Sequence, residues 1–262
     1  VIGLQEALKH QMDYISLEME DYGAYGLGRD DGNNSGEIMA ILWNRKQVFC
    51  ERMGTFWLSP TPDQVSLGWD AGYKRTATWG EFTVLATKQK FFYLNTHVDN
   101  TGNLARVQSI ALIKEKIKEL NPYGFPVIVT GDFNAGLEHA MFEPFGEWLF
   151  DARSTAPITD TKPTYHGFGK YSTKIDHIFY CGLEPLEYET VTKTYEGVTY
   201  ISDHYPITAL FELKGSANPD DPQAPGNYGD MIEEDLPLND YNEPPYSDGG
   251  YGDLKEEDYP LE

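Results

Sequence analysis

The sequence predicts a mixed α/β domain that spans residues 1–214. Short apolar strand patterns alternate with amphipathic helical ones, and the apolar content is enough for one sizeable core. The composition then changes sharply. Residues 216–262 hold fourteen Asp and Glu against one Lys, a net charge of −13, which leaves −9 of the total −22 for the first 215 residues. We therefore expect residues 215–262 to be an acidic, Pro/Gly/Tyr-rich disordered tail.

The chain opens with a strand pattern at residues 1–5 and places Glu6 at its end. Residues 8–19 follow as a predicted helix, because apolar residues recur at helical spacing from Leu8 to Met19. Glu6 therefore stands at a strand–helix junction. A carboxylate there can serve a site, or it can simply favour the helix N-terminus.

Residues 22–36 are rich in Gly, Asp and Asn and read as a loop. Glu37 then precedes IMAILWN, residues 38–44, an apolar run typical of a strand buried on both faces. Residues 56–77 form a long irregular segment with several aromatic residues. Such a segment is either the rim of a binding site or a packed Ω-loop over the core.

Residues 80–87 and 90–96 predict a hairpin whose second strand leads to His97. Asn103 is a candidate cap for a helix that stops at Asn121-Pro122. Its predicted apolar face consists of Leu104, Val107, Ala111, Ile117 and Leu120.

The stretch PVIVTGDFN, residues 126–134, is a short buried strand followed by Asp132 and Asn134. Residues two apart in an extended segment point to the same side, so the two polar groups emerge together. A carboxylate beside a carboxamide can hold water, a phosphate oxygen or a hard cation. The alternative is an ordinary Gly-Asp turn.

Residues 174–180, KIDHIFY, predict a strand with Asp176 and His177 on opposite faces. Residues 188–194 and 198–201 predict a hairpin that turns at Glu196-Gly197. The last feature of the folded part is SDHYP, residues 202–206, which leads into an apolar strand.

Taken in order, LQE, NTH, GDFN, IDHIF and SDHYPI resemble the endonuclease/exonuclease/phosphatase superfamily, which has the DNase I-like fold. The resemblance covers most of residues 1–214. It implies a four-layer α/β sandwich, in which two mixed β-sheets pack face to face with helices on the outside. The alternation of strands and helices is compatible with that architecture.

The resemblance implies hydrolysis of phosphate esters with Mg²⁺ or Mn²⁺. Glu6 of LQE and Asp203 of SDH would be metal ligands, and such sparse ligation leaves positions on the ion for water and phosphate. Asp132 and Asn134 would position the nucleophilic water and the scissile phosphate.

Two histidines would complete the site by the same resemblance. His204 would contact the phosphate or act as a general acid/base, with Asp176 orienting its ring. His97 would lie near the phosphate with Glu37 as its partner. A carboxylate on one ring nitrogen fixes the tautomer of a histidine and favours its charged form.

Three further residues are candidates for substrate binding. Arg75 could clamp a phosphate or form a salt bridge that supports its loop. Tyr165 and His166, in TYHGFG, could line a substrate pocket or pack beneath the site. His177 is not assigned a role.

The start of the chain departs from the family pattern. Members usually begin with an earlier strand carrying an asparagine of the site, whereas this chain starts at the LQE strand. We expect the domain to be N-terminally incomplete, and therefore poorly active or unstable without an N-terminal extension. Comparable turnover with and without such an extension would contradict this.

These observations favour a metal-dependent phosphoesterase acting on a phosphate mono- or diester of sugar, lipid or nucleotide type. The acidic body disfavours binding to a nucleic acid, so a DNA or RNA nuclease is the alternative. A catalytically silent binding module is a second alternative.

The remaining expectations concern context. We expect a monomer and no transmembrane segment, because no apolar run approaches membrane-spanning length. The compartment stays undecided, with export to the periplasm or surface open. The two cysteines resemble no zinc site.

Overall fold

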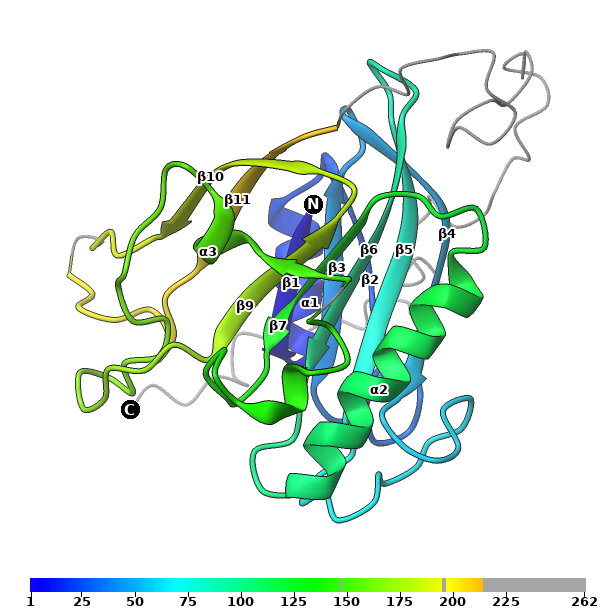
Figure 1. The fold of residues 1–262 in the computed structure, drawn as a ribbon, viewed down its shortest axis with the longest axis vertical. Helices are drawn as coiled ribbons and strands as arrows, with labels where there is room; N and C mark the ends of the chain where they lie inside the picture. The colour runs from blue at the N-terminus through cyan, green and yellow to red at the C-terminus, as the bar shows by residue number, and fades with distance from the viewer. Residues whose placement is uncertain (147, 195–196, 214–262) are drawn as a thin grey trace, which may run out of the picture.

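The computed structural model describes residues 1–146, 148–194 and 197–213. The predicted acidic tail lies outside these residues. Two layers of β-sheet pack face to face, with α1 (Lys9–Glu18) and α2 (Asn103–Leu120) on opposite outer faces (Figure 1). The predicted four-layer sandwich is therefore confirmed. No helix among the described residues is both long and apolar enough to cross a bilayer.

The larger sheet has six strands in the order β4-β5-β6-β7-β9-β8. β6 and β7 are parallel, and the other neighbours are antiparallel, so the sheet is mixed. α2 is the crossover between the two parallel strands, as their geometry requires. The strand bounds are β4 Val48–Trp57, β5 Thr76–Val84, β6 Lys90–His97, β7 Val127–Asp132, β8 Phe150–Asp151 and β9 Asp176–Cys181.

The second layer contains two smaller sheets, which are antiparallel throughout the described residues. One has the order β1-β3-β2, and the other pairs β10 with β11. Their bounds are β1 Ile2–Ala7, β2 Tyr22–Tyr25, β3 Ile38–Asn44, β10 Glu184–Thr190 and β11 Ile207–Glu212. Two short helical pieces, η1 (Ala140–Phe142) and α3 (Ala152–Thr155), complete the described structure.

β3 shows why the layers form, because both of its faces are buried as predicted. Leu42 belongs to a cluster with Met12 of α1. Its neighbours Ile41 and Trp43 point the other way and pack against the six-stranded sheet, where they meet Phe82. The strand thus connects the outer helix to the interior between the sheets.

The predicted apolar face of α2 is confirmed at its C-terminal end, where Ile117 is buried and Leu120 packs against the core, and is wrong at its N-terminal end. Leu104 and Val107 are 51% and 39% exposed, whereas Ile110 and Ile113 are buried. Asn103 is not the cap. The helix begins after Gly102, and the Asp70 carboxylate accepts the N–H groups of Leu104 and Ala105 at 3.3 and 2.7 Å.

Two other expectations need correction. Residues 22–36 were predicted to be a loop, but they contain β2, in which Gly23 leaves room for the ring of Trp43. The predicted hairpin over residues 188–201 is wrong, because β10 pairs with β11 and residues 198–201 form no strand. β4 was also absent from the sequence-based expectation.

Candidate active site

The strand ends near the parallel pair bring three predicted residues into one row. His97 is in register with Asp132 across β6 and β7, and Asp132 is in register with Asp176 across β7 and β9. All three side chains are buried. The topology of the sheet thus gathers residues that lie far apart in the sequence.

Asn134 ties this row together. Its backbone has φ +51°, and its N–H donates to Asp132 Oδ1 at 2.8 Å. Its Nδ2 donates to the carbonyl of Val98 at 2.9 Å and lies 3.0 Å from His97 Nε2. An amide nitrogen can only donate, so Nε2 of His97 is the acceptor and its ring proton belongs on Nδ1.

His97 is held in the neutral form. Burial lowers the pKa of His97 well below its usual range, and the charges of Arg75 and Arg29 lower it further. Its Nδ1 lies 3.8 Å from Glu6 Oε1 and 4.0 Å from Glu37 Oε2, with no hydrogen-bond partner. This buried nitrogen therefore faces two carboxylates without bonding to either.

His204 has the opposite character. Its Nδ1 lies 2.9 and 3.1 Å from the two carboxylate oxygens of Asp176, and its Nε2 lies 3.8 Å from Asp132 Oδ2. Burial alone would lower the pKa of His204, but the hydrogen bond and charge of Asp176, together with the charges of Asp132 and Asp203, raise it to about 9. His204 is therefore charged at neutral pH.

Asp132 lies between the two histidines. Its Oδ2 is 3.4 Å from His97 Nε2 and 3.8 Å from His204 Nε2. Burial, followed by repulsion from Asp176, raises the pKa of Asp132 to about 7. A carboxylate with that pKa can exchange a proton near neutral pH.

Two groups of side chains could hold a metal ion. Glu6, Glu37 and His97 form one, and Asp132, Asp176 and His204 form the other. Carboxylate oxygens suit a divalent cation, so Glu6 and Glu37 of the first group fit the predicted metal, whereas Nδ1 of His97 carries the ring proton and has no lone pair to donate. Glu6 has φ +58° at a bulge in β1, and its side chain is 62% exposed.

Asp203, the other predicted ligand, belongs to neither group of donors found among the described residues. Its carbonyl accepts the N–H groups of His166 and Gly167 at 2.9 and 3.1 Å. Metal ligation by Asp203 stays a prediction.

Arg29 is a site residue that sequence reasoning missed. Its guanidinium pairs with Glu37, whose pKa is raised by burial in spite of that charge. The loop composition of residues 22–36 concealed it, since the only signal is a lone arginine before DDGNNSG.

Arg75 forms the predicted loop salt bridge. It is 5% exposed, and its Nε lies 3.3 Å from Asp99 Oδ1. The same Asp99 accepts the N–H groups of Gly72, Thr101 and Gly102. Arg75 thus supports the long segment before β5, and its charge acts on His97 from there.

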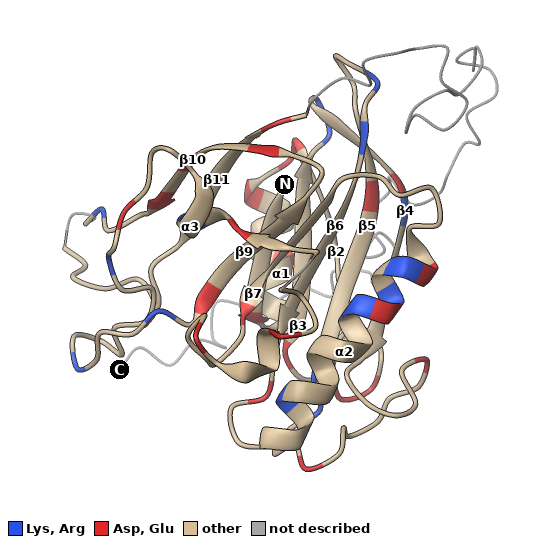
Figure 2. Cartoon of the chain, in the orientation of Figure 1, with Lys and Arg blue, Asp and Glu red and all other residues tan. Residues whose placement is uncertain are grey.

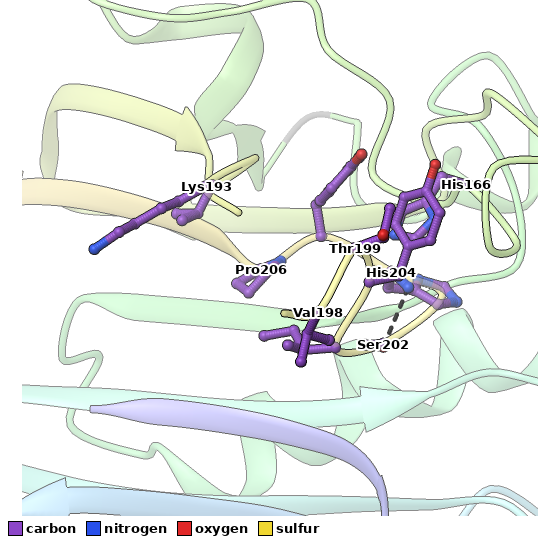
Figure 3. Close-up of a pocket in the computed structure, with 11 residues that line it drawn as sticks. His166, Lys193, Val198, Thr199, Ser202, His204 and Pro206 are labelled. Carbon is purple, nitrogen blue, oxygen red and sulfur yellow. Dashed lines mark hydrogen bonds between the residues drawn. The ribbon is translucent and has the colours of Figure 1, made fainter. Parts of the chain in front are cut away.

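The TYHGFG segment lies beside His204. The ring of Tyr165 is 4.8 Å from that of His204. His166 is buried and lines a pocket together with His204, residues 198–202 and residues 205–206 (Figure 3). Phe168, in contrast, is 59% exposed.

His177 lies on the other face of β9, as predicted. Its Nε2 is 2.9 Å from the carbonyl oxygen of Ala135, and its Nδ1 is 3.6 Å from Asp151 Oδ2. Aromatic rings surround it, namely those of Phe133, Phe142 and Phe179. It is therefore a core residue.

Comparison with known proteins supplies further findings. The model of the Endonuclease/Exonuclease/phosphatase family matches residues 1–204. A mannosyl-6-phosphatase from Bacteroides thetaiotaomicron is 34% identical; the match covers 80% of this chain and 84% of that one, with a TM-score of 0.77. An endonuclease/exonuclease/phosphatase from Bacteroides vulgatus is 35% identical, with coverages of 81% and 84% and a TM-score of 0.76.

A more distant relative is an uncharacterized protein from Acanthamoeba polyphaga mimivirus. It is 29% identical over 196 residues, which are 66% of this chain and 70% of that protein. The family match, at residues 1–204, includes every candidate site residue from Glu6 to His204.

Proposed function

The chain belongs to the Endonuclease/Exonuclease/phosphatase family, and from that premise we propose that it hydrolyses the phosphate ester of a small molecule with a divalent cation. The observation that carries the proposal is the pair of unlike histidines on either side of Asp132. One is neutral and one is charged, which is what a reaction needs when it must both remove and supply protons.

The proposed reaction forms a bond from a water oxygen to phosphorus and breaks the bond from phosphorus to the ester oxygen. Asp132 takes one proton of the water, and Oδ1 of Asn134, whose amide hydrogens are directed at Val98 and His97, accepts a hydrogen bond from the same water. His204 neutralises charge on the phosphate and supplies a proton to the departing oxygen, while Asp176 keeps its ring oriented.

The cation would be held by Glu6, with Glu37 of the same group and the predicted ligand Asp203 as further candidate donors. When bound, it would neutralise the negative charge that develops on the phosphate. The protein itself contributes the hydrogen bonds between Asn134 and Asp132 and between His204 and Asp176.

Two observations support a small substrate. Figure 2 shows Lys and Arg along α2 and in separate loops, interspersed with Asp and Glu, and the net charge of −9 over residues 1–215 is unfavourable for binding a nucleic acid backbone. The 34% identical neighbour is named a mannosyl-6-phosphatase, which makes phosphate monoesters of sugars the first substrates to try.

The test is a metal-dependent screen of the full chain after removal of bound metal with EDTA. Mannose 6-phosphate, glycerol phosphate, nucleotides, DNA and RNA are assayed with Mg²⁺ or Mn²⁺ added back. We expect turnover of a small ester that falls more than about 10³-fold without metal. His204→Ala and Asp132→Ala are the active-site variants, and Lys118→Ala on the exposed face of α2 is the matched control.

The outcomes separate the alternatives. Preferential cleavage of DNA or RNA, with steep salt dependence, would favour a nuclease. Binding of a phosphate ester without turnover in any condition would favour a silent binding module. Unchanged turnover in both active-site variants would contradict every hydrolase assignment.

A further inference from the structure

We propose that the hollow beside His204 holds the non-phosphate part of the substrate, and that this part is an uncharged polyhydroxylated ring such as a sugar. The inference rests on the proposed function, because it places the ring next to the histidine that would meet the phosphate. The hollow is lined by His166, Thr199, Tyr200, Ser202, His204 and Tyr205, among others.

Hydrogen bonds fix the walls of the hollow relative to the in-register row of His97, Asp132 and Asp176. The carbonyl of Asp203 accepts the N–H of His166, and the N–H of Tyr205 donates to the carbonyl of Thr164 at 2.7 Å. These bonds join the TYHGFG segment to the segment that carries His204. A group in the hollow would therefore have a defined position relative to that histidine.

Aromatic rings form one side of the hollow. The ring of His166 stacks on Tyr200 at 4.5 Å and 28° and packs against Tyr205 at 4.2 Å and 42°. Tyr165, which is not part of the lining, stacks on Tyr171 at 5.4 Å. Flat rings of this kind offer large contact area to the C–H face of a ring-shaped ligand.

Polar groups on the same walls argue for hydroxyl groups on the ligand. Thr199 and Ser202 contribute hydroxyls, and Nδ1 of His166 is buried without a hydrogen-bond partner. An acyl chain would leave such groups unpaired, at a cost that a polyhydroxylated ring avoids.

Charge argues against a cationic group in the hollow. Its lining contains no carboxylate among the described residues, and its lysine, Lys193, extends away from the two histidines (Figure 3). A neutral ring therefore fits the hollow better than an amine or a quaternary ammonium group does.

The test compares the ratio of kcat/KM for mannose 6-phosphate to that for methyl phosphate, which has no ring. In the full chain with metal we expect a ratio of at least about 10². Tyr200→Ala should lower it about tenfold, mainly through KM, because it removes the stacking face beside His166. Tyr200→Phe keeps that face and should retain most of the ratio.

A matched control is Tyr123→Ala, because Tyr123 is 66% exposed in the turn before β7. It should leave the ratio unchanged. His166→Gln is a second pocket variant, expected to lower the ratio as Tyr200→Ala does. Thermal unfolding of every variant shows whether it is folded.

Equal ratios in the wild type and a folded Tyr200→Ala variant would overturn the inference. So would a preference for nucleoside monophosphates that Tyr200→Ala abolishes, since the class of ring would then be wrong.

Failure of the proposed function looks different, because no ester, methyl phosphate included, would be hydrolysed. The binding of mannose 6-phosphate and of inorganic phosphate, measured by calorimetry, then decides. Tighter binding of the sugar phosphate that Tyr200→Ala weakens about tenfold supports the site. Equal binding of the two ligands refutes it.

Discussion

The two faces of β9 each carry a histidine–aspartate pair, and the pairs differ in what surrounds them. Asp176 and His204 lie on the face that meets Asp132, where the His204 side chain is 25% exposed. His177 and Asp151 lie on the opposite face, where the His177 side chain is 6% exposed among phenylalanine rings. His204 directs its Nε2 at Asp132. Both ring nitrogens of His177 face oxygen atoms of the protein core.

A His–Asp pair is therefore not sufficient to identify an active site. Both histidines have a carboxylate near Nδ1, but only His204 has its Nε2 directed at another titratable group. The four predictions below would each break or sharpen the contrast between the two faces.

The largest effect is expected from His204→Ala, which removes the charged imidazole beside Asp132. We expect kcat/KM to fall about 10³-fold, as is typical for loss of a general acid/base. Stability at pH 7 should also fall, by about 1–3 kcal/mol, because the buried Asp176 carboxylate loses its hydrogen-bonded partner. Steady-state kinetics with urea denaturation measure both quantities, and a loss of activity under tenfold would contradict the assignment.

The next effect is that of Asp176→Asn, which removes the carboxylate that orients His204. We expect kcat/KM to fall about 10²-fold, because the ring loses its fixed tautomer and the charge that favours protonation. The nitrogen chemical shifts of His204, followed by NMR, should show the change in tautomer. Wild-type shifts together with wild-type activity would remove Asp176 from the site.

His177→Gln should lower stability without the kinetic loss expected for His204→Ala. We expect a loss of about 1–3 kcal/mol in the free energy of unfolding, because a buried hydrogen bond to Ala135 is disturbed. The kcat/KM of the folded fraction should stay within about threefold of the wild type. A large kinetic loss without loss of stability would mean that this face also takes part in catalysis.

The smallest effect is expected from Asp151→Asn, and it depends on pH. Burial alone would raise the pKa of Asp151, but the nearby His177 ring and the hydrogen bonds from Ser154 outweigh burial and lower it. The charged form is therefore stabilised by folding. That stability is present above the unfolded pKa of about 3.9 and is lost as pH falls through the lower folded pKa.

The Asp151→Asn variant should accordingly be about 1 kcal/mol less stable than the wild type at pH 7. The difference should shrink below about pH 4, where the wild-type carboxylate becomes protonated. Urea unfolding at several pH values provides the measurement. A difference that does not depend on pH would assign the effect to packing.

Local patterns predicted the strand ends of this chain well. In the GDFN motif, Asp132 is the last residue of β7 and is buried. The alternation in KIDHIFY correctly predicted that Asp176 and His177 lie on opposite faces of β9. Such features depend only on residues close in sequence. The in-register row of His97, Asp132 and Asp176 could not be predicted, because it depends on which strands become neighbours.

The errors have the same origin. The buried face of α2 is selected by the sheet beneath it, and β10 pairs with a strand beyond the segment that local pattern favoured. Arg29 is visible only once the fold brings it to Glu37. Tertiary contacts decide these features, and no window of sequence contains them.

The left-handed backbone positions have a consequence for protein engineering. Glu6, Asn134 and Phe168 have φ values of +58°, +51° and +55°, and all three lie in or beside the candidate site. Side chains other than those of Gly, Asn and Asp make this conformation costly. A redesign aimed only at thermostability would therefore place glycine at positions 6 and 168 and would remove a candidate metal ligand as it did so.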